Sequence, residues 1–186
     1  MKPHTALPLI LAMGLLTPPA IAQEALAGDA RLACEALLCL SSGTRPQECA
    51  PALSRYFGIG GRKWSDVLRG RISFLNLCPV VSADNQMRTL ANDIANGAGR
   101  CDAASLNAAG MVWRGGEEGG HYISNVLPGH CAAYTQNAYT DLRNNGPRYV
   151  GLPEKNGYWV EAAQYAQALR DYNARLAAEN AARAGQ

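Results

Sequence analysis

The chain has 186 residues, of which 48% are hydrophobic and 7% aromatic, and its formal net charge is +2 at pH 7. This length suits one domain. The near-neutral charge gives no basis for general nucleic-acid binding or for a polybasic membrane patch.

The N-terminal residues have the layout of a secretory signal peptide. Lys2 supplies a positive start, an apolar run covers residues 6–16, and residues 20–22 form a small-x-small cleavage pattern. The apolar run is shorter than the roughly 20 residues that a spanning helix needs. We therefore predict cleavage after Ala22, export to the periplasm, and a mature single domain of residues 23–186 without a membrane span.

All six cysteines follow this cleavage site, and an even number of cysteines in an exported chain indicates disulfides. Their successive spacings are 5, 10, 29, 23 and 30 residues. These spacings include neither the close C-x2-C pairs of zinc sites nor the C-x-x-C motif of thiol oxidoreductases. Metal binding and redox catalysis are therefore disfavoured.

Apolar periodicity predicts three short helices in the region that holds the first four cysteines. The predicted helices are residues 29–40 capped by Asp29, residues 44–57 capped by Thr44, and residues 65–77 capped by Ser65 and stopped by Pro79.

Cys34 and Cys39 are five residues apart on the first helix, which places them about 140° apart around its axis. Each should therefore reach a different element. The short connection to the second helix favours antiparallel packing, which makes Cys39 and Cys49 natural partners. By elimination, the predicted pairs are Cys39–Cys49, Cys34–Cys78 and Cys101–Cys131.

The remaining elements are less regular. We predict a fourth helix at residues 82–97 capped by Ser82, a turn capped by Asp102 towards residue 109, a glycine-rich loop at residues 114–121, a helix at residues 131–142, strands at residues 148–152 and 157–160, and a last helix at residues 161–183 that frays after about residue 177. The predicted fold is mainly α: a small disulfide-stapled helical bundle with one short β-hairpin near the C-terminus.

The glycine-rich loop concentrates ionisable groups. Glu117, Glu118 and His121 lie in it, and His130 follows. Carboxylates and imidazoles bind metals and carry protons, but four glycines in eight residues would hold such groups poorly. We interpret the segment as a mobile surface loop and predict no metal, cofactor or catalytic residue.

A basic cluster lies around the third helix. It comprises Arg55, Arg62, Lys63, Arg69 and Arg71, with Asp66 among them. Such a cluster can contact an acidic partner or phosphate, but it is more commonly a solvated helix face, and we favour the second interpretation.

The last helix carries an apolar stripe that steps by 3 and 4 residues. Its members are Ala162, Tyr165, Leu169, Tyr172 and Leu176. The stripe indicates either core packing or a docking face, and its short length favours core packing. Because Tyr and Trp are common interface anchors, the candidate partner-contact residues are Tyr158, Trp159, Tyr165, Leu169 and Tyr172.

Several segments resemble the TrbM/KikA/MpfK family of conjugal transfer proteins. They are CEALLCLSSG, the EC of the second helix, FLNLCP, AYTDLR and RYVGLPEKNGYWVEAAQYAQAL. The resemblance runs from about Arg31 to Tyr172. It implies an exported accessory of a plasmid-encoded type IV secretion system that acts in mating-pair formation, with other proteins of that apparatus as partners and no established catalytic motif.

Two functions of different classes follow. The leading one is a non-enzymatic periplasmic assembly component that acts by protein–protein contact. The alternative is a small peptidoglycan hydrolase, since glycosidases use two carboxylates across the scissile bond. The available carboxylates are Glu35, Glu48, Glu117 and Glu118. No sugar-lytic motif accompanies them, so we predict that the protein is not an enzyme.

Overall fold

The computed structural model describes residues 26–114 and 119–185. The predicted signal peptide, Glu117 and Glu118 lie outside the described residues. Within the part that is described, no helix combines the length and the apolar character that a bilayer crossing requires.

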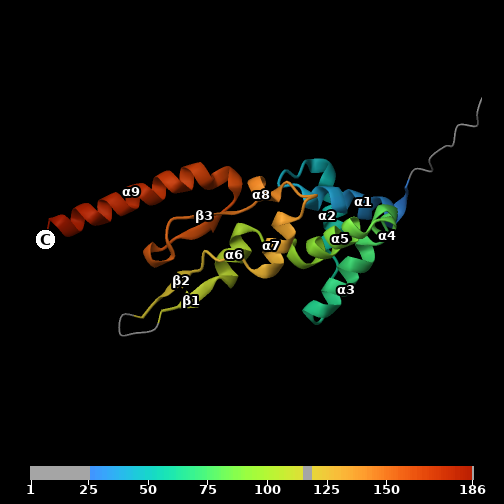
Figure 1. The fold of residues 1–186 in the computed structure, drawn as a ribbon, viewed down its shortest axis with the longest axis horizontal. Coiled ribbons are helices and arrows are strands. Elements are labelled where there is room, and N and C mark those ends of the chain that lie inside the picture. The colour runs from blue at the N-terminus through green and yellow to red at the C-terminus, as the bar shows by residue number, and fades with distance from the viewer. Residues whose placement is uncertain (1–25, 115–118, 186) are drawn as a thin grey trace, which may run out of the picture.

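Helices α1 to α8 form a body at one end of an elongated molecule (Figure 1). The bounds are α1 Gly28–Ser41, the 3-10 turn η1 Gln47–Cys49, α2 Ala50–Phe57, α3 Trp64–Leu75, α4 Pro79–Ala83, α5 Asn85–Gly97, α6 Ala103–Ala109, α7 Gly129–Gln136 and α8 Leu142–Asn145. We call these segments the helical body. The mainly α prediction is confirmed.

The core of the body lies between α1, α2, α3, α5 and α7. Leu40, Leu75, Leu90 and Ile94 are almost completely buried there, together with many alanines that allow short helices to approach closely. Tyr56 is also fully buried, and its hydroxyl donates to the carbonyl of Ile94 at 3.1 Å. This bond satisfies the polar atom that a buried tyrosine brings into an apolar core.

Two hairpins and the last helix project from the body, and we call them the arm (Figure 1). The bounds are β1 Met111–Trp113, β2 His121–Ile123, β3 Arg148–Val150, η2 Pro153–Lys155, β4 Tyr158–Val160, η3 Ala162–Gln164 and α9 Tyr165–Ala184. β1 pairs with β2, and β3 pairs with β4, both antiparallel.

The arm has its own small apolar cluster. Val150 and Val160 of the second hairpin pack with Ala168 and Tyr172 of α9. Four of the five residues of the predicted stripe, Tyr165, Leu169, Tyr172 and Leu176, therefore pack in or against this cluster, which is the core-packing alternative.

The structure contains a hairpin that the sequence analysis missed. Residues 114–121 were interpreted as a loop, but strands β1 and β2 flank it and pair with Val112 opposite Tyr122. The two strands have three residues each, which is too short to show alternating polarity. The signal that was available is a β-prone run on each side of a glycine-containing connection, which is typical of a hairpin.

Several predicted caps were wrong. Thr44 does not begin the second helix: Pro46 precedes a 3-10 turn and α2 starts at Ala50, because Pro51 has no N–H to donate and fits only the first turn. Pro79 follows the end of α3, and it also starts the additional short helix α4. In place of Ser82, Asp84 caps α5 and accepts from two backbone N–H groups.

Three further boundaries differ. Asp29 lies inside the first turn of α1, which has no side-chain cap, and α3 starts after Lys63 without a cap from Ser65. The helix predicted over residues 131–142 is broken after Gln136. Asn137 causes this break, since its side chain accepts from the N–H of Tyr139 at 3.0 Å and so forms a local turn that competes with the helix. By contrast, Asp102 caps α6 as predicted.

Candidate functional site

Three disulfides hold the helical body together. Cys34–Cys78 joins α1 to the end of α3, Cys39–Cys49 joins α1 to η1, and Cys101–Cys131 joins the start of α6 to α7. These are the three pairs that the spacing predicted, and they include every cysteine of the chain. The disulfides all lie in the body, so they make it the stiff part of the molecule.

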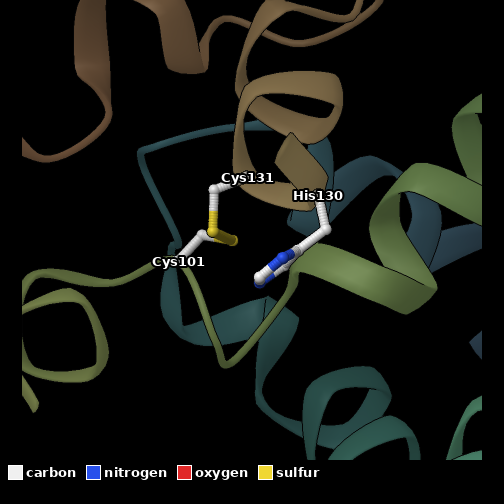
Figure 2. Close-up of side chains that lie close together, drawn as sticks. All are labelled: Cys101, His130 and Cys131. Atoms are coloured by element: carbon white, nitrogen blue, oxygen red, sulfur yellow. A yellow bond between two sulfur atoms is a disulfide. The ribbon is translucent and has the colours of Figure 1, made fainter. Parts of the chain in front are cut away.

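The third disulfide has an imidazole beside it. Figure 2 shows His130 next to the bonded sulfurs of Cys101 and Cys131, with the potential ligand atoms of the three residues within 4.8 Å of one another. Metals bind thiolates, however, and these sulfurs are joined at 1.96 Å. Burial and the nearby Arg100 lower the pKa of His130. One neutral imidazole against a buried disulfide does not make a metal site.

An enclosed cleft lies where the body meets the arm. It measures about 150 Å³, and Arg45, Asp102, Tyr134 and Glu161 are among its lining residues. Small-molecule sites usually measure roughly 300–1,000 Å³. Both carboxylates of the cleft are already engaged, since Glu161 accepts from the N–H of Ala103 at 2.7 Å and Asp102 caps α6. The side chains of this cleft therefore connect the body to the arm.

Two of the four carboxylates named for hydrolysis, Glu35 and Glu48, lie in the described residues, and they are surface groups on different elements. Glu35 on α1 forms an ion pair with Arg31 at 2.6 Å, and Glu48 on η1 is exposed. Neither lines the enclosed cleft. A retaining or inverting glycosidase needs two carboxylates facing one bond, and Glu35 and Glu48 do not line a substrate cleft.

The basic cluster does not form one charged face. Arg55 is paired with Asp29 at 2.8 Å, and Arg69 is paired with Asp66 at 2.7 Å. Arg71 is only 8% exposed. The cluster is therefore partly neutralised and partly buried, which is why it offers no continuous anion-binding surface.

Arg71 is held by aromatic rings. Its guanidinium lies over Tyr56, Phe57 and Trp64 at 4.7, 5.4 and 5.5 Å from the ring centroids, and it donates to the carbonyl of Ala98 at 3.1 Å. Its Nε has no hydrogen-bond partner within the described residues. Cation–π attraction to three faces offsets part of the cost of burying this charge, and the residue joins α2, α3 and the turn after α5.

The candidate partner-contact residues divide into two groups. Trp159 and Tyr172 are 8% and 4% exposed and lie inside the molecule. The side chains of Tyr158, Tyr165 and Leu169 are half-buried around the arm cluster, so these three keep some surface that a partner could contact.

The buried tryptophan fastens the arm to the body. The indole N–H of Trp159 donates to the carbonyl of Ser124 at 3.0 Å, and its backbone N–H donates to Asn107 on α6 at 2.7 Å. Tyr149 packs edge-on against it at 5.3 Å and donates to the carbonyl of Ile123 at 2.6 Å. Burial raises the pKa of Tyr149 to about 12, so this phenol stays a neutral donor. Both hairpins are thereby held in one orientation.

Large apolar side chains are exposed on the arm instead of being buried. Trp113 is 76% exposed and Val126 is 72% exposed. We call the following set the arm surface: Met111, Val112, Trp113, Val126 and Leu152. Met111, Val112 and Trp113 are consecutive in β1, and exposed apolar groups of this kind can mark protein-interaction sites. The sequence analysis missed this set; the Met-Val-Trp run before the glycine-rich loop was the available signal.

A shallow groove lies beside the arm surface. Its lining includes Arg114, Tyr122, Val126 and Glu154, and it measures about 360 Å³. Arg114 lies over the ring of Tyr122 at 5.7 Å and donates to the carbonyl of Pro153 at 3.3 Å. The groove lies between the first hairpin, the residues that follow it and the η2 turn, and its lining contains both polar and apolar side chains.

Comparison with known proteins gives one match. The family model TrbM matches residues 25–173, which includes all three disulfides, both hairpins and the first part of α9. No curated protein and no solved structure matches the chain. Because the family model covers most of the chain, this protein belongs to the TrbM family of conjugal transfer proteins.

Proposed function

We propose that this protein is a periplasmic, non-enzymatic accessory of a conjugative type IV secretion system, and that it acts in mating-pair formation by contacting other proteins of that apparatus. The observation that carries the proposal is the family match over residues 25–173. The disulfide-bonded body and the apolar arm surface support contact as the mode of action.

Export is supported by the sulfur chemistry. Disulfides form and persist in oxidising compartments such as the periplasm, and the chain contains three. The signal peptide proposed at residues 1–22 would deliver the chain there. Cell fractionation and an intact-mass measurement with and without reduction test this part, and a cytoplasmic protein with free thiols would contradict it.

The two ends of the molecule have different roles in this proposed function. The body is a rigid base, and the arm surface meets the partner. Trp159 and Tyr172 are buried and stabilise the arm, while Tyr158, Tyr165 and Leu169 are partly exposed and are proposed as further contact residues. An enzymatic role would instead need a substrate-sized cleft with free acid and base groups.

Conjugation frequency tests the function. A strain whose transfer system lacks this protein should transfer its plasmid less often, and the wild-type chain supplied in trans should restore transfer. With the double variant Trp113→Ala, Val126→Ala supplied in trans, the conjugation frequency should be about tenfold or more below that with the wild-type chain. Tenfold is the factor that a loss of roughly 1.4 kcal/mol of contact free energy gives.

Leu38 provides a matched control. It is as exposed as Val126, at 72%, but lies on α1 in the body. Leu38→Ala should restore transfer fully. Normal transfer in the deletion strain would contradict the proposed function, and equal loss with Leu38→Ala would contradict the assignment to the arm. Cross-linking in cells with a complete transfer system would identify the partner.

The hydrolase alternative has its own test. Purified protein should leave cell-wall sacculi intact. Clearing that is lost in Glu35→Gln or Glu48→Gln would instead establish an enzyme.

A further inference from the structure

Strand β1 has one free edge. Arg114 donates to the carbonyl of Gly120 at 2.9 Å, and Ser124 donates to the carbonyl of Gly110 at 2.8 Å. In an antiparallel pair, bonded and non-bonded positions alternate. The register therefore directs the backbone groups of residues 110, 112 and 114 towards β2, and those of Met111 and Trp113 away from it.

This free edge lacks the usual protection against strand addition. Natural edge strands carry lysines, prolines or bulges, whereas β1 consists of Met111, Val112 and Trp113, and all three are exposed. Among the described residues, the outward-facing backbone groups of Met111 and Trp113 have no hydrogen-bond partner. With their large apolar side chains, these two residues form a template for another extended strand.

The edge is complementary to itself. Met111 and Trp113, which face outward, flank Val112 symmetrically. If a second copy is placed antiparallel with the two-fold axis at Val112, Met111 of each copy stands opposite Trp113 of the other. Four backbone hydrogen bonds can then form, and each thioether meets an indole, which is a favourable contact.

Charge does not oppose this pairing. In the same register Arg114 of each copy falls opposite Gly110 of the other, so the two guanidiniums lie at opposite ends of the contact. The chain as a whole carries a formal charge of only +2, which gives little long-range repulsion between copies. For a strand from a different protein, neither the register nor the charge of the partner can be stated.

We infer that β1 pairs with β1 of a second copy, so that the two hairpins form one four-stranded antiparallel sheet. The inference rests on the proposed function of the arm as a protein-contact surface, and it identifies a second copy of this chain as one protein that the arm contacts. A three-residue edge is much smaller than a standard interface, so the association should be weak and should depend on protein concentration. The pair then presents two α9 helices and two grooves to the transfer apparatus.

Charge substitutions at the two-fold axis test the inference. Sedimentation of the purified protein should show the mass rising towards that of a dimer as concentration increases through the micromolar range. Val112→Lys and Val112→Glu should each abolish this rise, because like charges would stand directly opposite in a close, non-hydrogen-bonded pair. Mixing the two variants should restore the dimer.

A second measurement covers the case in which a charged variant does not fold. Val112→Cys should form a disulfide-linked dimer under mild oxidation, because the two-fold axis brings the same residue of both copies together. Leu38→Cys should not. A wild-type protein that stays monomeric at hundreds of micromolar, a dimer that persists in both charge variants, or association only with a foreign strand would overturn the inference. Because these measurements use purified protein, a failure here leaves the conjugation test of the proposed function intact.

Discussion

The helical body and the arm are stabilised by different means. The body has a hydrophobic core of aliphatic and aromatic side chains and three disulfides. The arm has none of the disulfides; its buried cluster consists of Val150, Val160, Ala168 and Tyr172. Covalent links act mainly by restricting the unfolded chain, whereas the arm depends on packing and hydrogen bonds formed in the folded state.

Because of this difference, the residues that stabilise the fold lie mainly in the body, whereas the residues proposed for partner contact lie in the arm. The arm exposes Trp113, which at 76% is far more exposed than Trp64 of the body at 39%, and it is held to the body through Trp159. A protein that assembles with others benefits from such a division, because surface residues of the arm can serve binding without weakening the core that supports them.

The largest expected effect concerns the body. Replacing Cys34 and Cys78 by serine removes a link that spans 44 residues, and the chain-entropy model assigns about 4 kcal/mol to such a loop. Removing Cys39–Cys49, which spans 10 residues, should cost about 1 kcal/mol less. Urea unfolding followed by far-UV circular dichroism measures both. Equal costs for the two variants would indicate that loop length does not determine their contribution.

A smaller effect should be confined to the arm. Gly151 has φ +82°, and a Cβ placed there would lie 2.1 Å from the ring of Tyr172. Gly151→Ala should cost about 3 kcal/mol through the left-handed backbone and overpacking. Hydrogen exchange should show lost protection in β3 and α9 and unchanged protection in α5. Protection lost equally in α5 would mean that body and arm unfold as one unit.

Removing one hydrogen bond sharpens the same comparison. The hydroxyl of Tyr172 accepts from the backbone N–H of Leu152 at 3.0 Å. Tyr172→Phe should cost about 1 kcal/mol, the usual net value of such a bond, while the ring continues to cover Gly151. Thermal unfolding measures the loss. Tyr158→Phe is the matched control, since its half-buried phenol has no described bond of this kind, and it should be neutral.

The smallest effect depends on pH. Asp141 accepts from the N–H of Gly43 and from the hydroxyl of Ser42, and these bonds lower its pKa. A carboxyl with a lowered pKa in the folded state contributes stability above its ordinary pKa of about 3.9, and this contribution is lost as pH falls through the lower folded value.

Asp141→Asn should therefore reduce the loss of stability below about pH 4. The group is largely exposed, so the change should be less than about 1 kcal/mol after solvent screening. Denaturation midpoints at pH 3 and pH 6 measure it. Asp29, whose pKa Arg55 lowers, titrates in the same direction and provides a comparison. An unchanged acid slope in Asp141→Asn would show that the bonds to Gly43 and Ser42 contribute nothing.

Much of the body could be predicted from the residues alone. Helical periodicity placed Cys34 and Cys39 on different sides of one helix, and short connections limited which cysteines could meet. Both arguments use local geometry, which a single chain contains in full. The family resemblance rests on the cysteine-bearing segments together with two C-terminal segments, and membership of the family is confirmed by a match over residues 25–173.

The burial of individual aromatic residues was decided only by the tertiary structure. Trp113 and Trp159 both lie in three-residue strands among apolar neighbours, yet one is 76% exposed and the other 8%. The difference arises because α6 and Ser124 cover Trp159, while described residues leave the edge of β1 open. Local sequence specifies that a segment is extended and apolar. Which face receives a neighbour depends on segments far away in the chain, and so the exposure of Trp113 and the burial of Trp159 were decided only by the tertiary structure.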